Sequence, residues 1–345
     1  MITNVIVLPH PAALPLPKIN EMKAAVLYSK GAGPKYVDMP APAPKNEQEA
    51  LVSVKAVALK HFDKSRARGT HYSTEGDKPE AKIIGRDGVC VLPDGTRVYA
   101  LGASGMMAEK ATVEKNRVVR IPAGLDDITA AALPNAVIGA AMALRFRGGI
   151  EPGDTVLING ATGFTGRVAV QIARHYGAGR IVVTGRNPQS LKELVALGAD
   201  ELISTQQADE DFIAQVRQVQ AHSPIHVIID YLWGHTAEMI LAAIKGDGSF
   251  GQRTRFVSVG AVTGDLIRLS AASLRSMDLV LSGSGLGSWT KREVGLLFSE
   301  ILPEMFGLAA DGKLTVETIA VPLAEIEKLW EMDVSAGNKR LVVRI

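Results

Sequence analysis

The segment 160–166, with the sequence GATGFTG, has the residue types and spacing of a turn that binds phosphate groups. It follows the apolar run TVLING and precedes the helical pattern RVAVQIARHYG, so its glycines fall between a strand and a helix. A helix N-terminus presents free N–H groups and the positive end of the helix dipole. Aligned on the pattern GxGxxG, the segment predicts a dinucleotide site made of Ala161, Thr162, Gly163, Phe164, Thr165 and Gly166.

The second strand of this unit ends in the sequence VTGRN, which includes Gly185, Arg186 and Asn187. A site for NAD(H) carries Asp or Glu here, because a carboxylate accepts hydrogen bonds from the adenosine ribose. Gly185 stands at that position, so no acid repels a 2'-phosphate, and Arg186 can form charge-assisted bonds with it. We therefore expect NADP(H) to be preferred over NAD(H). The alternative is that Arg186 is an ordinary solvated residue.

Two further segments are candidates for the nicotinamide half of the cofactor. Gly260 and Ala261 end an apolar strand and allow the backbone to approach the ligand closely. Ser284, within SGSG, can bond the carboxamide. The alternative for this glycine-rich segment is a tight turn near a dimer interface.

Two kinds of periodicity predict the elements that position these residues. From about residue 150 to 285, apolar runs alternate with helical patterns, which is typical of a doubly wound parallel sheet. From residue 22 to about 120, short strands alternate with turns, which favours a mostly β domain. Two helices and a last strand, RLVVRI, follow, and this lone strand needs a sheet to join. We expect an extension over 1–21, a discontinuous β domain over 22–134 and 286–345, and a nucleotide-binding domain over 135–285.

Composition and charge exclude several classes of protein. The 38 basic and 36 acidic residues nearly cancel, which gives no argument for nucleic acid or an anionic membrane as partner. The apolar segment 128–144 contains Pro134 and Asn135 and is shorter than the roughly 20 residues of a membrane span, so we expect a buried helix. Cys90 is the only cysteine, which excludes an internal disulfide and favours a reducing compartment, the cytoplasm.

Together these features resemble the medium-chain dehydrogenase/reductase superfamily, and within it the zinc-independent quinone oxidoreductase-like branch. The resemblance covers nearly the whole chain from Met22 and includes KAAVLY, IIGRDG, AALPNAVIGAAMAL, NGATGFTG and GNKRLVVRI. It implies an α/β fold in which a GroES-like, mostly β domain accompanies a Rossmann domain. It also implies a homodimer, because family members commonly pair their Rossmann domains along one sheet edge.

The resemblance places the metal ligands of zinc-dependent members at Lys60, Arg86 and Asn135 of this chain. Charged lysine and arginine have no lone pair for zinc, so we expect no metal. Without a Lewis acid, the chemistry that remains natural is hydride transfer from NADPH to an electrophilic acceptor, a quinone or an α,β-unsaturated carbonyl (enone). The alternatives are an alcohol or aldehyde (carbonyl) reductase and a non-catalytic NADPH-binding protein.

Three residues are candidates for the chemistry. Tyr72, in GTHYS, matches a tyrosine that quinone oxidoreductases place beside the nicotinamide, where it can donate to the acceptor oxygen. Lys60 can stabilise a developing enolate or quinol oxyanion, or it can equally form an ion pair with Asp63 or Asp87. Asp63 matches a recurrent family position and can simply hold its loop. We expect Arg86 and Asp87 to form a structural pair in the space that a metal would take.

Overall fold

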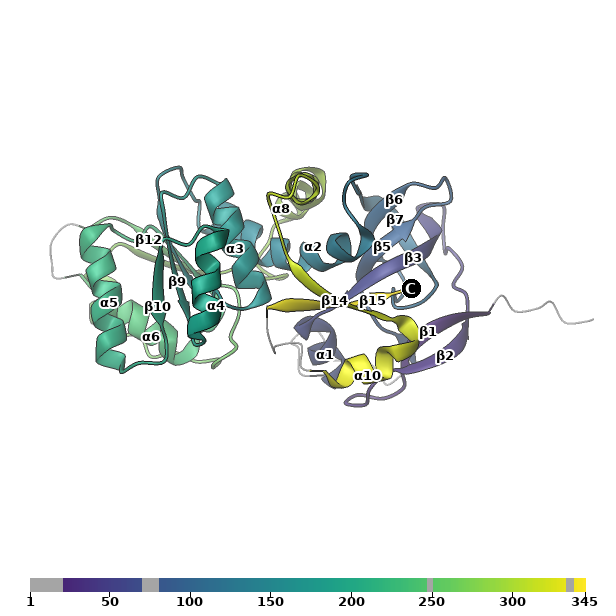
Figure 1. Ribbon diagram of the computed structural model, residues 1–345, viewed down its shortest axis with the longest axis horizontal. Helices are drawn as coiled ribbons and strands as arrows, with labels where there is room; N and C mark the ends of the chain where they lie inside the picture. The colour runs from purple at the N-terminus through teal and green to yellow at the C-terminus, as the bar shows by residue number, and fades with distance from the viewer. Residues whose placement is uncertain (1–20, 70–80, 247–250, 333–337) are drawn as a thin grey trace, which may run out of the picture.

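The structure is a computed structural model that describes residues 21–69, 81–246, 251–332 and 338–345. Tyr72 and nearly all of the predicted N-terminal extension lie outside these residues. Figure 1 shows two halves, one built on a parallel sheet and one mostly β, with helix α2 (Asp127–Met142) between them.

The first half contains a six-stranded sheet in which every neighbouring pair of strands is parallel. From one edge to the other its strands are β10 (Glu201–Ser204), β9 (Arg180–Gly185), β8 (Thr155–Asn159), β11 (Val227–Asp230), β12 (Thr254–Ser258) and β13 (Leu279–Gly283). The strand order reverses between β8 and β11, which makes this the switch point of a doubly wound sheet. The predicted doubly wound parallel sheet is therefore confirmed.

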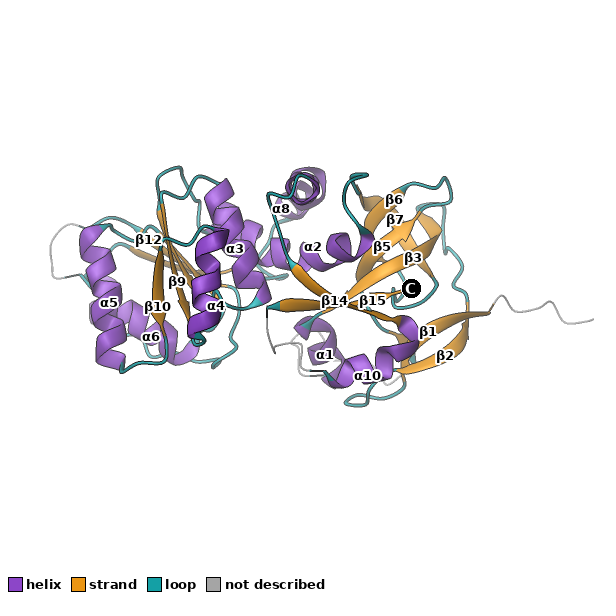
Figure 2. Cartoon of the chain, viewed as in Figure 1, coloured by secondary structure: helices purple, strands orange, loops and turns teal. Residues whose placement is uncertain are grey.

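Helices cover both faces of this sheet, which is why its central strands β8 and β11 are buried along their whole length. Figure 2 shows α5 and α6 on one side and α3 and α4 on the other. The helical elements of this half are α3 (Phe164–His175), α4 (Pro188–Glu193), η3 (Leu194–Leu197), α5 (Asp209–His222), α6 (Gly234–Ala243) and α7 (Ala271–Arg275).

The second half is a small barrel with additional strands. Four strands close on themselves because the first also pairs with the last: β3 (Glu49–Leu59), β5 (Asp87–Val91), β6 (Arg97–Gly102) and β7 (Lys110–Arg120). A separate sheet contains β1 (Glu21–Leu27), β2 (Lys35–Pro40) and β4 (Lys82–Ile83).

The last strand, β15 (Lys339–Arg344), pairs with β3, so distant parts of the chain share the barrel sheet. It is not the lone strand that the sequence pattern predicted, because β14 (Glu317–Pro322) runs parallel beside it. The prediction missed β14 because it is an edge strand whose residues are all at least partly exposed, which leaves little apolar alternation. The proposed domain limits at 134/135 and 285/286 stay a prediction.

Helix α2 forms the core between the two halves. It continues into a π-helical turn, η2 (Ala143–Arg147), and the combined helix is long and apolar enough to cross a membrane by length and composition alone. Of its most apolar window, 67% is buried against the rest of the protein, so it is the buried helix that the sequence predicts.

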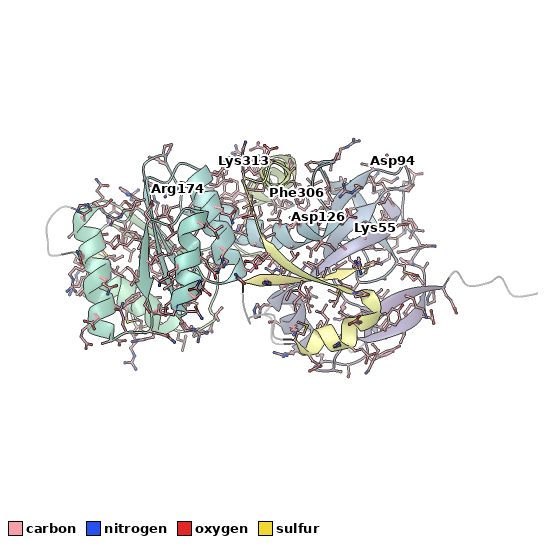
Figure 3. All side chains as sticks on the ribbon, viewed as in Figure 1. Lys55, Asp94, Asp126, Arg174, Phe306 and Lys313 are labelled. Carbon is pink, nitrogen blue, oxygen red and sulfur yellow. The ribbon has the colours of Figure 1, made fainter. Side chains whose placement is uncertain are left out.

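The remaining helices lie around the barrel and beside α2. They are α1 (His61–Arg68), α8 (Lys291–Leu296), η4 (Leu297–Ile301), α9 (Leu302–Ala310), η5 (Leu323–Glu325) and α10 (Ile326–Glu331). Phe306 of α9, labelled in Figure 3, packs edge-on against Tyr99 of β6 with 6.1 Å between ring centroids.

Candidate functional site

The predicted cofactor residues gather at the carboxyl ends of the strands in the parallel sheet. The segment 160–166 follows β8, and residues 185–187 lie at the end of β9. Residues 260–261 come after β12, and Ser284 directly follows β13. Parallel strands end at the same edge, so the fold brings these four segments, far apart in sequence, to the carboxyl ends of the strands.

The turn after β8 is fastened to the end of β9. Gly160 adopts a φ of 82°, and its N–H donates to Thr184 Oγ1 at 3.0 Å. The N–H of Ala161 donates to the carbonyl of Thr184 at 2.9 Å. A Cβ at Gly166 would lie 2.5 Å from Ala161 Cα, so only glycine lets helix α3 start this close to the turn. The turn therefore has the compact form that a phosphate-binding loop needs.

The N-terminus of α3 has no side-chain cap. Gly163 is its N-cap residue and is exposed, and a Cβ there would have only Gly160 O near it, at 3.9 Å. The N–H groups of the first helical turn have no intrahelical partner, so an uncapped start leaves them available to an anion. This part of the site fits a pyrophosphate.

The end of β9 carries donors and no carboxylate. Gly185 is buried, Arg186 is exposed, and the Asn187 side chain caps α4 by accepting the N–H of Ser190 at 2.9 Å. Directly after the neighbouring strand β10, Thr205 donates its N–H to Gly185 O at 2.9 Å, and its buried hydroxyl has no hydrogen-bond partner. An arginine and an unpartnered hydroxyl at this position fit a phosphate on the adenosine ribose.

A buried network of hydrogen bonds joins the ends of strands β8, β9 and β11. Asn159 donates to Asp230 Oδ1 at 2.8 Å and accepts from Thr184 Oγ1 at 2.6 Å. The Asp230 carboxylate also accepts the N–H groups of Leu232 and Trp233. Trp233 has a φ of 58°, a strained value for a residue with a side chain, and the bonds to Asp230 hold it there. The sequence motifs gave no sign of this network.

The residues predicted for the nicotinamide half of the cofactor follow the next strands of the sheet, β12 and β13. A Cβ at Gly260 would lie 2.7 Å from Tyr231 O, so the turn after β12 requires glycine, while Ala261 is exposed. Ser284 is buried, and its hydroxyl accepts a hydrogen bond from Trp289 Nε1 at 3.1 Å. This local bond occupies one acceptor site of the hydroxyl and leaves its proton for another partner.

Lys60 lies in a buried charge cluster of the barrel half. Its side chain is 2% exposed, and its Nζ bonds Asp87 Oδ1 and lies 3.7 Å from Asp63 Oδ2. The Tyr99 hydroxyl donates to Asp87 Oδ2 at 2.9 Å. Although burial alone would lower it, the carboxylates of Asp63 and Asp87 raise the pKa of Lys60, which keeps it an ammonium. The ion pairs that the sequence left as one interpretation of Lys60 are therefore confirmed.

Asp63 has a second contact, with the backbone of its own helix. Its carboxylate accepts the N–H of Lys60 at 2.9 Å, which caps the start of α1. The expected Arg86–Asp87 pair is wrong, since the two oxygens of Asp87 bond Lys60 and Tyr99 while Arg86 is exposed. The buried position of Lys60 makes its ammonium the better partner for a carboxylate at this depth.

Arg340 is a further charged residue at this place, and the sequence motifs did not find it. It lies on β15 and is buried, and its guanidinium carbon is 4.4 Å from the Phe164 ring centroid. One terminal nitrogen lies 3.5 Å from Asn135 Oδ1, while Nε has no hydrogen-bond partner. Burial lowers the pKa of Arg340 to about 10, against the opposing field of Asp63 and Asp87. Arg340 follows Lys339 at the start of β15 and is the second charged residue of that strand, a pattern that does not by itself indicate burial.

Two of the three positions at which the resemblance places zinc ligands take part in other interactions. Lys60 is ion-paired and Asn135 lies beside Arg340. Within the ranges that the structure describes, no three His, Cys, Asp or Glu side chains are grouped to hold a metal ion.

A surface groove of about 380 Å³ lies away from the predicted cofactor residues, at the C-terminal end of α3. It is lined by Gln171, Arg174, His175, Leu197, Lys313 and Thr315, among others, and Figure 3 labels Arg174 and Lys313. Its polar side chains already have partners within the protein, for example Asp200 for Arg174 and Glu304 for His175. We therefore place the site at the strand ends and not in this groove.

Comparison with known proteins finds a match within the parallel-sheet half. A family model described as zinc-binding dehydrogenase matches residues 165–301. That range covers most of the parallel-sheet half and includes none of Lys60, Arg86 and Asn135, so the match does not concern the metal positions.

Relatives and solved structures extend the similarity to both halves. The chain is 25% identical to the probable NADPH-dependent quinone reductase TdiC of Emericella nidulans, over 90% of this chain and 96% of that protein. It is 27% identical to the quinone oxidoreductase of Thermus thermophilus, solved also with NADPH, with a TM-score of 0.75 over 94% and 100% of the two chains. This likeness confirms a GroES-like β part joined to a Rossmann sheet.

A third relative is matched only in part. The chain is 30% identical to the mitochondrial enoyl-[acyl-carrier-protein] reductase of Arabidopsis thaliana, over 51% of this chain. The match spans less than half, 46%, of the length of that enzyme.

Proposed function

We propose that this chain, which belongs to the medium-chain dehydrogenase/reductase superfamily and is quinone oxidoreductase-like, is an NADP(H)-dependent oxidoreductase that reduces a quinone or an α,β-unsaturated carbonyl compound. The observation that carries the proposal is the arrangement of residues at the carboxyl ends of β8 and β9. An uncapped helix N-terminus there adjoins a strand end with Arg186 and without an acid. Relatives named for NADPH-dependent quinone reduction support the same cofactor and acceptor.

Each segment at these strand ends would hold one part of the cofactor. The N–H groups at the start of α3 would bind the pyrophosphate, and Arg186 would pair with the 2'-phosphate. The segments at Gly260, Ala261 and Ser284 would hold the nicotinamide half. When bound, the cofactor supplies a hydride to the acceptor.

The protein's own part in the reaction is positioning and charge stabilisation. Tyr72 is our candidate donor to the acceptor oxygen. Lys60 is 2% exposed, so it would act on a developing oxyanion by its electrostatic field rather than by contact. Asp63 and Asp87 would act through Lys60, by holding the ammonium in place.

We also propose that the reaction needs no zinc, because the side chains at the metal positions include a buried ammonium that cannot ligate a cation. The enone arm of the proposal is supported by the similarity to an enoyl reductase. Reduction of simple ketones or aldehydes would need another source of alkoxide stabilisation. A non-catalytic NADPH-binding role would give the cluster of Lys60, Asp63 and Asp87 no oxyanion to stabilise.

A homodimer is the assembly that we propose. Strand β13 is an edge of the parallel sheet, and its Val280 and Leu281 are 41% and 38% exposed. Leu274 and Leu286, on either side of this strand in sequence, are also exposed. An exposed apolar edge strand favours pairing with a second copy. The single buried cysteine, Cys90, supports a cytoplasmic location.

One assay tests the proposed function. NADPH oxidation is measured with 1,4-quinones, enals and simple ketones, and NADP+ reduction is measured with alcohols, each with and without a chelator. We expect turnover of quinones or enals that the chelator leaves unchanged. Turnover limited to simple ketones and alcohols, or loss of activity with the chelator, contradicts the proposal.

A further inference from the structure

The last residue of β9, Gly185, is packed against the side chain of Thr162. A Cβ added to Gly185 would overlap the Thr162 methyl carbon, and it would lie 3.1 Å from Thr162 Oγ1 and 3.2 Å from Leu191 Cδ2. Carbon atoms in favourable contact are about 3.5–4.0 Å apart. The space that the first carbon of any side chain at 185 needs is therefore already filled.

Thr162 cannot easily withdraw, because its segment is tied down on both sides. The preceding residues, Gly160 and Ala161, are bonded to Thr184 on the strand that Gly185 ends. The carbonyl of Thr162 accepts Arg167 Nε at 3.4 Å, and the largely buried Arg167 is ion-paired with Glu193 of α4. Moving Thr162 would thus disturb the same turn whose N–H groups we assign to the pyrophosphate.

We propose that Thr162 is a second determinant of cofactor choice, which acts by filling the space that Asp or Glu at position 185 would need. This inference rests on the proposed function, because it concerns how the chain distinguishes NADP(H) from NAD(H). An acid at 185 fits only when the residue at 162 is smaller than threonine. The preference for the 2'-phosphate is then set by the pair of residues and not by the strand end alone.

The pair predicts a non-additive response to substitution. Gly185→Asp alone forces the turn away from β9, so it weakens the binding of both reduced dinucleotides. Thr162→Ala alone removes the obstacle without adding a carboxylate, so the ratio of the two affinities changes little. Only the double variant has both the space and the acid, and only it gains the ribose contact that favours NADH.

The test uses the whole chain and two readouts, fluorescence titration with NADPH and with NADH, and thermal unfolding without cofactor. We expect Gly185→Asp to lower Tm by roughly 3 to 10 °C and to weaken both cofactors roughly tenfold or more. Thr162→Ala/Gly185→Asp should recover most of the lost Tm and bind NADH more tightly than NADPH. Thr162→Ser/Gly185→Asp is the matched control, because serine keeps the hydroxyl and removes only the overlapping methyl group. It should behave like the alanine double variant.

Two outcomes would overturn the inference. In one, Gly185→Asp alone inverts the cofactor preference at unchanged Tm. In the other, the double variants are as unstable and as weak in binding as Gly185→Asp. Failure of the proposed function looks different, since the wild-type chain would then bind neither reduced dinucleotide. The Tm values of the same variants would still decide whether Thr162 blocks position 185.

Discussion

The guanidinium of Arg340 lies over the ring of Phe164, with 4.4 Å between the guanidinium carbon and the ring centroid. Arg340 belongs to the last strand of the barrel half, and Phe164 is the first residue of α3 in the parallel-sheet half. The contact thus joins the two halves directly beside the turn that follows β8.

Replacing Phe164 by leucine should lower the free energy of unfolding by about 1–2 kcal/mol, because a desolvated cation loses the face of the ring. Urea unfolding at pH 7 measures the loss. The control is Phe146→Leu, whose ring lies 5.5 Å from the guanidinium of the exposed Arg145 and should cost less. Equal losses in the two variants would show that burial adds nothing to the Arg340 contact.

Replacing Lys60 by methionine should destabilise the protein by about 3–5 kcal/mol, because Asp63 and Asp87 would stay buried without their cation. The milder Tyr99→Phe should cost about 1–2 kcal/mol through one unsatisfied carboxylate oxygen. Lys55→Met, at an exposed lysine on β3, the strand that ends just before Lys60, is the control and should stay within about 0.5 kcal/mol of wild type. A Lys60 variant as stable as the Lys55 variant would contradict the buried ion pairs.

Protonation of Glu293 at acid pH should lower the free energy of unfolding. Its carboxylate accepts two bonds from Arg147, at 2.8 and 3.1 Å, and these bonds lower the pKa of Glu293 to about 2. A carboxyl in the unfolded chain titrates near about 4.3, so the stabilisation is complete above that pH and is lost as the pH falls toward 2.

The variant Glu293→Gln should therefore be less stable than wild type by roughly 1–3 kcal/mol at pH 7, and the difference should shrink below about pH 4. Urea unfolding at pH 7, 4 and 3 measures it. Glu300→Gln, in the more exposed pair with Arg145, serves as control and should show a smaller difference at pH 7. A difference for Glu293→Gln that does not change with pH would rule out this titration.

Arg186→Ala should weaken NADPH binding roughly 10- to 100-fold, since a charge-assisted bond to the 2'-phosphate is lost. NADH lacks that phosphate, so its affinity should stay within about twofold. Arg217→Ala on α5 removes the same charge away from the strand ends and should leave both affinities unchanged. Equal affinities of the wild-type chain for NADPH and NADH, unaffected by Arg186→Ala, would refute the role of Arg186.

A charge on strand β13 should separate the proposed dimer. Leu281→Glu places a carboxylate on the exposed apolar edge, so size-exclusion chromatography with light scattering should report the monomer mass of 36.6 kDa. Ile319→Glu, at a similarly exposed position on the edge strand β14, should keep the wild-type mass. A wild-type chain that already runs as a monomer would end the dimer proposal.

Much of the fold follows from periodicity in the sequence. The alternation of apolar runs with helical patterns was enough to predict the parallel sheet, and the glycines predicted the tight turn after β8. The strand β14 escaped because an edge strand with partly exposed residues lacks that alternation.

The charge cluster could be predicted only in part. Asp63 is three residues from Lys60, so a local pair was foreseeable, and Asp87 was one of two expected partners. Tyr99 and Arg340 reach the cluster through barrel pairing and register, which a single sequence does not reveal. The sequence shows only that Gly185 replaces an acid, whereas the structure shows that the side chain of Thr162 fills the space beside Gly185.

The place of β15 in the barrel sheet also concerns how the protein is made. Strand β3 has β15 as its neighbour on one side, where Leu59 faces Leu341, and β15 leaves the ribosome after every other strand. The parallel sheet uses only residues 155–283 and can be complete by then. The β3–β7 pairing can close the barrel without β15, but residues 56–59 of β3 lack a partner on one side until β15 is made. The addition of β15 is therefore a late, long-range step, and until then this part of β3 is exposed to chaperones or to aggregation.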